Sequence, residues 1–244
     1  MKRLFPFCLL GALLSGATAA AQPTFRLGLR GGANRATTTL DAGSTGSEYG
    51  RFFYGADKSA IYAWQTGAVL EMAFRRFAVQ PALLFSQKGE ELHTHTYVDG
   101  VAGANTQDTR RVSRSNWLEL PVNVVYTVHG VQFFAGPYVA LAVGGRERST
   151  TLLASPYARY APIEYDGKLF FGPDAANRRF DAGFNAGVGY RCGPVQVQLG
   201  YGLGLLNLRR APVDVISEFP FHDFGADPSR HRVVQLTGTY FFQL

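Results

Sequence analysis

The side chains of residues 117–128 alternate between an apolar set and a mixed set. Every even position in this stretch is Leu, Val or Tyr, whereas the odd positions include Glu119 and Asn123. A period of two is the period of a β-strand, because successive side chains point to opposite faces of a sheet. The pair His129-Gly130 follows, and the alternation then resumes up to residue 144. The stretch is almost as apolar as a membrane helix, yet its period predicts two antiparallel strands joined by a tight turn.

Eight segments of the chain carry this alternation. They lie near residues 25–30, 64–74, 77–88, 117–128, 131–144, 180–190, 195–205 and 234–244. Short turns near residues 75–76, 129–130 and 192–194 alternate with long polar segments near residues 36–61, 92–113, 146–178 and 209–230. An even strand number with short turns at one end and long loops at the other is typical of outer-membrane barrels. The sequence therefore predicts an all-β fold: an eight-stranded antiparallel up-and-down transmembrane β-barrel with four long outer loops and short periplasmic turns.

The alternation alone does not exclude a soluble β-sandwich or a soluble ligand-holding barrel, whose strands also place polar residues on one face. The alternating loop lengths favour the membrane barrel, and so does the placement of glycine. The chain has 28 glycines, and those in the predicted strands gather on the polar face. Glycine suits the cramped interior of a small barrel better than a solvated outer surface.

The N-terminus favours export. Lys2 and Arg3 precede an apolar stretch over residues 4–14 and a run of small residues that ends at Ala21. This pattern predicts a secretory signal peptide over residues 1–21, cut before Gln22, and export through the general secretory pathway. An anchor helix fits less well, because the apolar stretch is shorter than the roughly 20 residues that span a bilayer. We expect residues 22–244 to form one multi-pass β-barrel domain in the outer membrane of a Gram-negative bacterium.

Cysteine and charge exclude several classes of protein. After signal removal Cys192 is the only cysteine, so no intramolecular disulfide can form. Removal of Lys2 and Arg3 lowers the formal net charge from +6 to +4, because the signal contains no acid. The remaining charges are scattered rather than gathered in one basic patch, so no nucleic-acid partner is expected. We expect a monomer surrounded by outer-membrane lipid and lipopolysaccharide.

Three stretches carry a family resemblance. They are RLGLRGGANRA at residues 26–36, NWLELPVNVVY at 116–126 and TGTYFFQL at 237–244. They resemble the small PorT-like outer-membrane β-barrel proteins, a porin-like group that begins its barrel with a Gly-Gly-Asn stretch and carries an aromatic-Leu-Glu-Leu/Ile-Pro strand. The resemblance covers nearly the whole mature chain and implies this fold, this location and a partner in an envelope or secretion assembly. The chain departs from the pattern at Leu244, where such barrels often end in Phe.

Six charged side chains belong to the predicted inward face, and an eight-stranded barrel is only wide enough for side chains to fill. These lumenal residues are Arg26, Arg30, Glu71, Lys88, Glu119 and Asp181. Charges in a narrow, largely dry lumen must be paired and hydrogen-bonded. We expect Glu71 and Glu119 to bond Arg26 and Arg30 across the barrel and to form a structural plug. A narrow porin-like channel, with a path for protons or small solutes along the same residues, is the alternative.

The histidines give little support for an enzyme. None of the five has an obvious Ser or Asp partner on its own strand face, and His222-Asp223 is an isolated pair in a predicted loop. His93 and His95 point to the same side of an extended segment and could bind a metal, although further ligands are not identifiable. The sequence therefore predicts no catalytic residue, no metal site and no cofactor.

The predicted outer loops are the better place for function, because variable functions are usually carried by loops on a rigid scaffold. The segment from residue 146 to 179 is rich in arginine and tyrosine, which are typical anchors of protein interfaces. Its interaction candidates are Arg146, Arg148, Tyr157, Tyr160, Tyr165, Arg178 and Arg179. The alternative is that its aromatic side chains cover the barrel mouth or form the girdle at the lipid headgroups. Arginine at this end could also contact the phosphates of lipopolysaccharide.

Overall fold

The computed structural model describes residues 23–39, 44–46, 52–100, 103–173, 175, 177–209 and 229–243. The predicted signal peptide and most of the predicted loop at 209–230 lie outside these residues. No helix in the described part is long and apolar enough to cross a membrane. The described residues form eleven strands: β1 (Thr24–Thr38), β2 (Ser44–Gly46), β3 (Phe52–Ser59), β4 (Ile61–Phe74), β5 (Phe77–Gly100), β6 (Gly103–Val128), β7 (Val131–Ala154), β8 (Ile163–Lys168), β9 (Phe180–Cys192), β10 (Val195–Gly204) and β11 (His231–Gln243).

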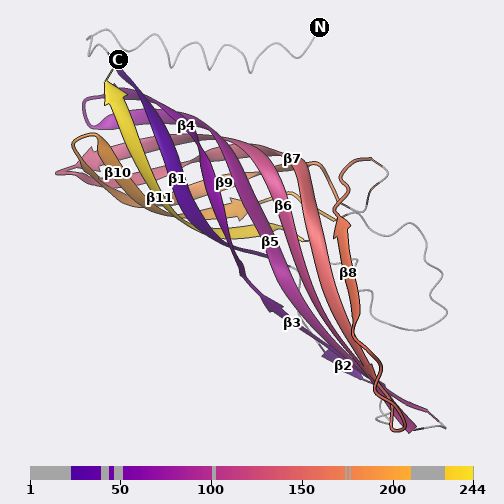
Figure 1. Cartoon of the computed structure of the whole chain (residues 1–244). Helices are drawn as coiled ribbons and strands as arrows, with labels where there is room; N and C mark the ends of the chain where they lie inside the picture. Colours follow the sequence, from indigo (N-terminus) through magenta and orange to yellow (C-terminus); the bar gives the residue numbers. More distant parts are fainter. Residues whose placement is uncertain are drawn as a thin grey trace, which may run out of the picture.

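The sheet closes into a ring (Figure 1). Its order is β5-β4-β1-β11-β10-β9-β7-β6, and β6 pairs again with β5. All neighbours in the ring are antiparallel. Each of the eight segments predicted from the sequence overlaps one strand of this ring, whereas β2, β3 and β8 arise in segments that were predicted to be loops. The described part therefore contains eleven strands rather than the expected eight.

The short turns lie where the sequence predicts them. Val128 pairs with Val131 around His129 and Gly130, whose φ angles of 50° and 85° are the left-handed values that a type I′ hairpin turn requires. Gly193, with φ of 58°, occupies the first position of the β9–β10 turn. β1 begins and β11 ends near these turns, because Thr24 pairs with Ala73 at the β4–β5 turn. We call this end of the ring the turn end.

At the opposite end three strands run far beyond the ring. β5, β6 and β7 contain 24, 26 and 24 residues, compared with 13 in β9 and 10 in β10. β3 pairs with the free edge of β5, β2 with β3, and β8 with the free edge of β7, so this protruding sheet has the order β2-β3-β5-β6-β7-β8 (Figure 1). The loop predictions are therefore wrong at residues 92–100, 103–113, 146–154 and 163–168, which lie in strands, whereas residues 155–162 form the expected connection. These strand residues stay in the ladder although the one-sided apolar pattern has ended.

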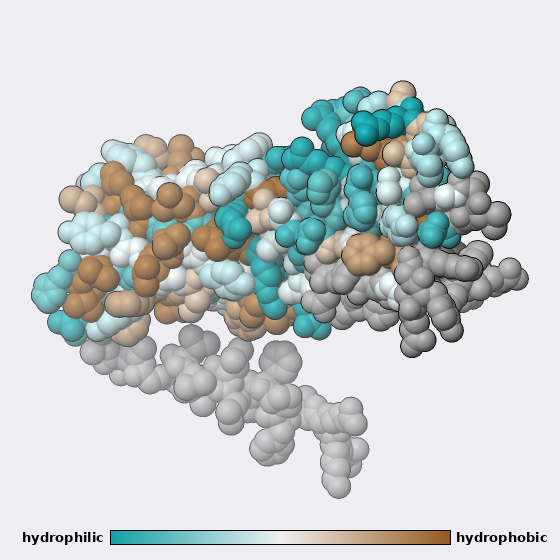
Figure 2. Space-filling view, turned by 90° about the horizontal axis from the view of Figure 1, so that it is seen from below, coloured by the Kyte–Doolittle hydropathy of each residue, from teal (hydrophilic) through white to brown (hydrophobic). Residues whose placement is uncertain are grey.

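Apolar side chains cover the outside of the ring. Phe133, Leu199 and Leu236 are each about half exposed, and Figure 2 shows hydrophobic residues over the barrel and hydrophilic residues toward the protruding end. Aromatic pairs border this belt: the rings of Phe77 and Tyr126 lie 4.9 Å apart near the turn end, and Trp64 and Phe85 lie 5.4 Å apart near the other. An outward apolar band between aromatic girdles is the surface of a membrane barrel.

Candidate functional site

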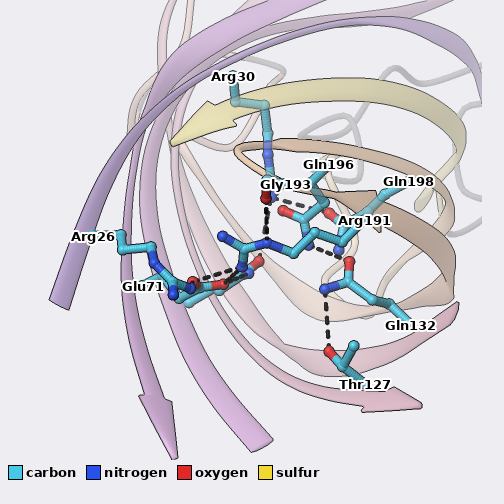
Figure 3. A network of polar contacts seen from close by, with 10 residues as sticks. Arg26, Arg30, Glu71, Thr127, Gln132, Arg191, Gly193, Gln196 and Gln198 are labelled. Carbon is cyan, nitrogen blue, oxygen red and sulfur yellow. Dashed lines mark hydrogen bonds and ion pairs between the residues drawn. The ribbon is translucent and has the colours of Figure 1, made fainter. Parts of the chain in front are cut away.

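The lumen contains two buried groups of charged residues. One lies near the turn end, and the other lies near the mouth, which is the opposite end of the ring, where the protruding sheet begins. The first is centred on Glu71, which is 1% exposed. Arg26 Nη1 donates to Glu71 Oε1 at 2.9 Å, Arg191 Nη1 donates to both carboxylate oxygens at 2.7 and 2.6 Å, and Gln80 Nε2 donates to Oε2 at 2.8 Å (Figure 3). Arg26 and Glu71 are direct cross-strand partners, so the structure brings together two of the six predicted lumenal residues. Arg191, at the end of β9, was missing from the predicted set.

Arg30 differs from the prediction. It is buried, but its guanidinium donates to neutral acceptors: Thr239 Oγ1 at 2.9 Å, Gln198 Oε1 at 3.0 Å and Gln80 Oε1 at 3.5 Å (Figure 3). The expected pairing of Arg30 with a carboxylate is therefore wrong. Several neutral oxygens can solvate a buried guanidinium in place of one carboxylate, because arginine offers five donors in a fixed plane.

The second group lies nearer the mouth. Lys88 Nζ lies 2.6 Å from Glu119 Oε1, and both side chains are almost fully buried, with 2% and 3% of their surface exposed. The same ammonium lies 4.7 Å from the centre of the Tyr138 ring. The prediction that Glu119 pairs with an arginine is thus wrong in the identity of the cation, since Lys88 holds that place. The register explains this, because both Lys88 and Glu119 lie well away from the turn end, where Arg26 is found.

Asp181 completes the group at the mouth. Tyr138 Oη donates to Asp181 Oδ2 at 3.1 Å, and His231 Nδ1 lies 2.9 Å from the same oxygen. The His231 ring also stacks edge-on against Trp117, with centroids 5.2 Å apart. Asp181 lies on β9 and His231 on β11, so an expectation limited to partners on the histidine's own strand face did not include this contact. The signal is the strand alternation. His231 falls on the inward-facing positions of β11, and Asp181 is the first inward-facing residue of β9, at the same depth in the barrel.

Loop residues cover this group from the mouth. Phe171 and Leu208 pack on Trp117, which is 1% exposed. Beside them Arg209 Nη2 donates to Glu90 Oε1 at 3.0 Å, and Thr38 Oγ1 donates to the other oxygen of Glu90. Among the described residues, one cavity in the middle of the lumen, lined by Arg30, Glu119 and Gln198 among others, has a volume of about 10 Å³, which is about the room that one water requires. Around this cavity, side chains such as Arg30, Glu119 and Gln198 fill the lumen.

The predicted outer-loop candidates fall into two places. Arg146 and Arg148 on β7 and Tyr165 on β8 belong to the protruding sheet, and Tyr157 and Tyr160 lie in the connection between these strands, 83% and 57% exposed. Arg178 and Arg179 lie instead at the barrel mouth, where the Arg178 amide donates to Leu208 O and Arg179 Nε donates to Ala142 O. The seven residues therefore do not form a single surface.

An exposed charge cluster joins β7 to β8. Arg146 Nη2 donates to Asp166 Oδ2 at 2.8 Å, and Arg148 Nε donates to the same oxygen at 3.0 Å. The hydrogen bond from Arg146 is the main reason that the pKa of Asp166 lies below its ordinary value. In the same way the hydrogen bond from Arg110 lowers the pKa of Glu91 on the neighbouring strands. These carboxylates are therefore ionised at neutral pH and hold the arginines in place.

The two histidines of β5 lie in the protruding sheet. His95 Nδ1 contacts Asp108 Oδ1 across the β5–β6 ladder, and both side chains are about half exposed. His93 faces Arg110 in the same ladder. Within the described ranges no group of three or more His, Cys, Asp or Glu side chains could hold a metal ion. His222 and Asp223 lie outside the described residues.

The sequence itself matches a known family over most of its length. Residues 20–210 match the family described as outer membrane protein beta-barrel domain. The chain belongs to this family. As an outer-membrane β-barrel protein with porin-like architecture, it resides in the outer membrane of a Gram-negative bacterium, and its lipid-facing belt agrees with that location.

Solved structures of other outer-membrane barrels show weak likeness to this member of the family. Neisserial surface protein A is 9% identical, with 89% of this chain and 97% of that chain covered and a TM-score of 0.35. An outer membrane channel from Pseudomonas putida F1 is also 9% identical, with 93% and 98% covered and a TM-score of 0.28. No curated protein matches the chain. The family assignment therefore comes from the sequence match and not from these likenesses.

Proposed function

We propose that the chain is a plugged, monomeric, eight-stranded barrel of structural or interaction type, without catalytic activity or cofactor. The eight strands of the ring would span the membrane. The observation that carries the proposal is the filling of the lumen: Trp117, Lys88, Gln65 and Glu71 are among its largest fully buried side chains. Two groups of ion pairs hold this filling, and a buried ion pair broken on one side is costly. Such a lumen supports a scaffold more than a passage.

The protruding sheet would face the cell exterior. In outer-membrane barrels the short turns are periplasmic and the long connections are external. The start of β1 and the end of β11 also lie beside the short turns, so the turn end would face the periplasm. Cysteine labelling on intact cells tests this orientation. Cys192 is exposed beside a short turn, so a membrane-impermeant maleimide should leave it unlabelled while it labels a Tyr157→Cys variant made in a Cys192→Ser background. Labelling of Cys192 alone would reverse the orientation.

The connection between β7 and β8 would bind a protein partner in the envelope. Ala154 bridges to Arg159, so the connection forms a short hairpin, and Tyr157, Tyr160 and Tyr165 around it are more than half exposed. Exposed tyrosines are typical anchors of protein interfaces, because they supply a large contact area at low entropic cost. The PorT-like resemblance supports an envelope or secretion assembly as the place of that partner.

Photo-crosslinking tests the partner directly. A photoreactive phenylalanine analogue placed at Tyr157 should give one reproducible adduct with an envelope protein in living cells. The matched control is the same analogue at Tyr240, which is also about half exposed but lies on the lipid-facing side of β11. If neither Tyr157 nor Tyr160 gives an adduct, or if Tyr240 gives the same one, the interaction surface lies elsewhere or does not exist.

A narrow porin-like channel is the second candidate. The observation that favours it is that Asn123 Oδ1 and Gln198 Nε2 are buried without a protein partner and both residues line the small lumenal cavity. Buried polar groups of this kind often hold water. Swelling of liposomes that contain the purified protein in small sugars would favour the channel, whereas a plugged barrel leaves the swelling rate at that of protein-free liposomes.

A further inference from the structure

Three cations lie directly opposite one another on adjacent strands of the protruding sheet. Arg114 of β6 pairs with Arg146 of β7, and Arg146 pairs with Lys168 of β8. Directly opposed residues point to the same face of a sheet, and like charges in that position destabilise it. Arg148 lies two residues further along β7, on the same face as Arg146. The structure thus gathers four cations where strand pairing alone disfavours them.

We call Arg114, Arg146, Arg148 and Lys168 the basic row. The carboxylates of the described residues compensate its charge only in part. Asp166 is shared between Arg146 and Arg148, and Glu164 lies two residues further along β8. Arg114 donates instead to neutral oxygens, Tyr62 O at 2.8 Å and Gln87 Oε1 at 3.3 Å. A surplus of positive charge therefore remains on an exposed surface, and an external anion would relieve it.

The depth of the basic row indicates which anion. Arg114 shares its strand face with Leu118, the first lipid-facing residue of β6 from the protruding end, and Val143 precedes the row on β7 and is half exposed. Figure 2 shows hydrophilic surface beginning where the hydrophobic belt ends. The row therefore lies at the border of the belt, on its lipid-facing side. Lipid headgroups occupy this depth in a bilayer.

The row also has room for a ligand. A hollow of about 510 Å³ is lined by Gly144, Gly145, Arg146, Asp166, Gly167 and Lys168. This volume lies within the usual range for small-molecule sites, roughly 300–1,000 Å³. Nothing lies within 4 Å of the place where a Cβ on Gly144 would stand, so the glycine leaves the floor open. Arg146 directs Nε and Nη2 to Asp166, which fixes the plane of its guanidinium beside the hollow and leaves Nη1 to donate a charge-assisted hydrogen bond to a phosphate.

We propose that Arg146 and Lys168 bind a phosphate group of an outer-leaflet lipid headgroup, while Arg114 adds positive charge from the neighbouring strand. The phosphate lies in the hollow between β7 and β8, hydrogen-bonded to Arg146 and Lys168, and neutralises the row. The choice of an outer-leaflet lipid rests on the proposed orientation, with the protruding sheet outside the cell. Bound lipid would fix the height of the barrel in the membrane and the tilt of the protruding sheet.

Binding of lipid A, the phosphorylated anchor of lipopolysaccharide, to the full purified chain in neutral detergent tests the site. The probes are bisphosphorylated lipid A, chemically dephosphorylated lipid A and inorganic phosphate, with affinity measured by thermophoresis. The test variant is Arg146→Gln with Lys168→Gln. The matched control is Arg110→Gln, which removes an exposed arginine that Glu91 already neutralises. Heat-modifiable migration on a gel confirms that each variant is folded, and Arg146→Lys keeps the charge if the double variant fails to fold.

We expect the double variant to bind bisphosphorylated lipid A at least tenfold more weakly, and Arg146→Lys severalfold more weakly, with less than a twofold change in Arg110→Gln. The wild type should bind dephosphorylated lipid A as weakly as the double variant does. Unchanged binding in the variant, equal binding of the dephosphorylated lipid, or inorganic phosphate that binds as tightly as lipid A would each overturn the proposal. Binding in detergent does not depend on orientation, so a failure here is distinct from a failure of the cysteine labelling.

Discussion

Removal of the carboxylate at Glu119 should strongly destabilise the barrel. Lys88 and Glu119 are 2.6 Å apart and at most 3% exposed, so Glu119→Gln leaves a buried ammonium without its counter-ion. Breaking a buried ion pair on one side costs about 3–5 kcal/mol. The Tyr138 ring, 4.7 Å from the ammonium, still offers a cation–π contact, so the lower end applies. A loss of about 3 kcal/mol corresponds to a roughly hundredfold fall in the ratio of folded to unfolded protein.

Urea unfolding in lipid vesicles measures this loss through tryptophan fluorescence. The chain has two tryptophans; Trp117 lies two residues from Glu119 on the same face and reports on the lumen, while Trp64 faces outward and can be replaced by Phe. A double variant with Lys88→Met and Glu119→Leu removes both charges, and apolar replacement of a whole buried pair is often neutral or stabilising. We therefore expect it to recover at least half of the loss.

Two results would refute this reasoning. A loss below about 1 kcal/mol in Glu119→Gln would place the pair in a far more polar setting than its burial indicates. A double variant as unstable as the single one would show that the loss comes from packing and not from the uncompensated charge.

Two further predictions concern the wall and the protruding sheet. Gly136→Ala should lower the free energy of unfolding by about 1–3 kcal/mol through overpacking, because the new Cβ would lie 2.0 Å from Val122 O. Gly31→Ala should change the urea midpoint little, because nothing lies within 4 Å of its Cβ. Equal urea midpoints in the two variants would contradict this prediction. Arg146 lowers the pKa of Asp166 in the folded state. The contribution of Asp166 to the stability of the β7–β8 pair is therefore complete above its unfolded-state pKa of about 3.9, and it is lost as pH falls through the lower folded-state pKa. Amide protection in β8 should therefore be weaker at pH 2 than at pH 7, and undiminished protection at pH 2 would count against it.

The ring could be predicted from the sequence because its strands obey one simple rule. In each strand one face meets lipid and the other a packed lumen, so the alternation is strong. The short turns are recognisable as well, because they contain residues typical of tight turns, as at His129-Gly130. The protruding hairpins lack this contrast. Residues 92–99 and 105–113 meet water on much of both faces, so the apolar period disappears although β5 and β6 continue. Their β-structure comes from cross-strand pairing and from threonines that suit an extended chain.

The lumenal pairs were only partly predictable, because partners across a barrel are distant in sequence. Parity places Glu71 and Glu119 inside but gives neither their depth nor their partners. Counting from the turns adds the depth: Glu119 lies ten residues before His129, and Lys88 lies twelve after Arg76 on the neighbouring strand. That count favours Lys88 over Arg26 or Arg30 as the partner of Glu119. His231 needs one step more, since its acid comes from a strand two places away in the ring.

Single-channel recording in planar bilayers tests the plugged lumen most directly. Wild-type protein, with insertion verified by protease protection in the same lipid, should give no steady conductance steps above the protein-free baseline in 1 M potassium chloride. Steady unitary steps in the wild type that change in size with Glu119→Gln would show that ions pass along the lumenal charges, and the plugged barrel would then be wrong.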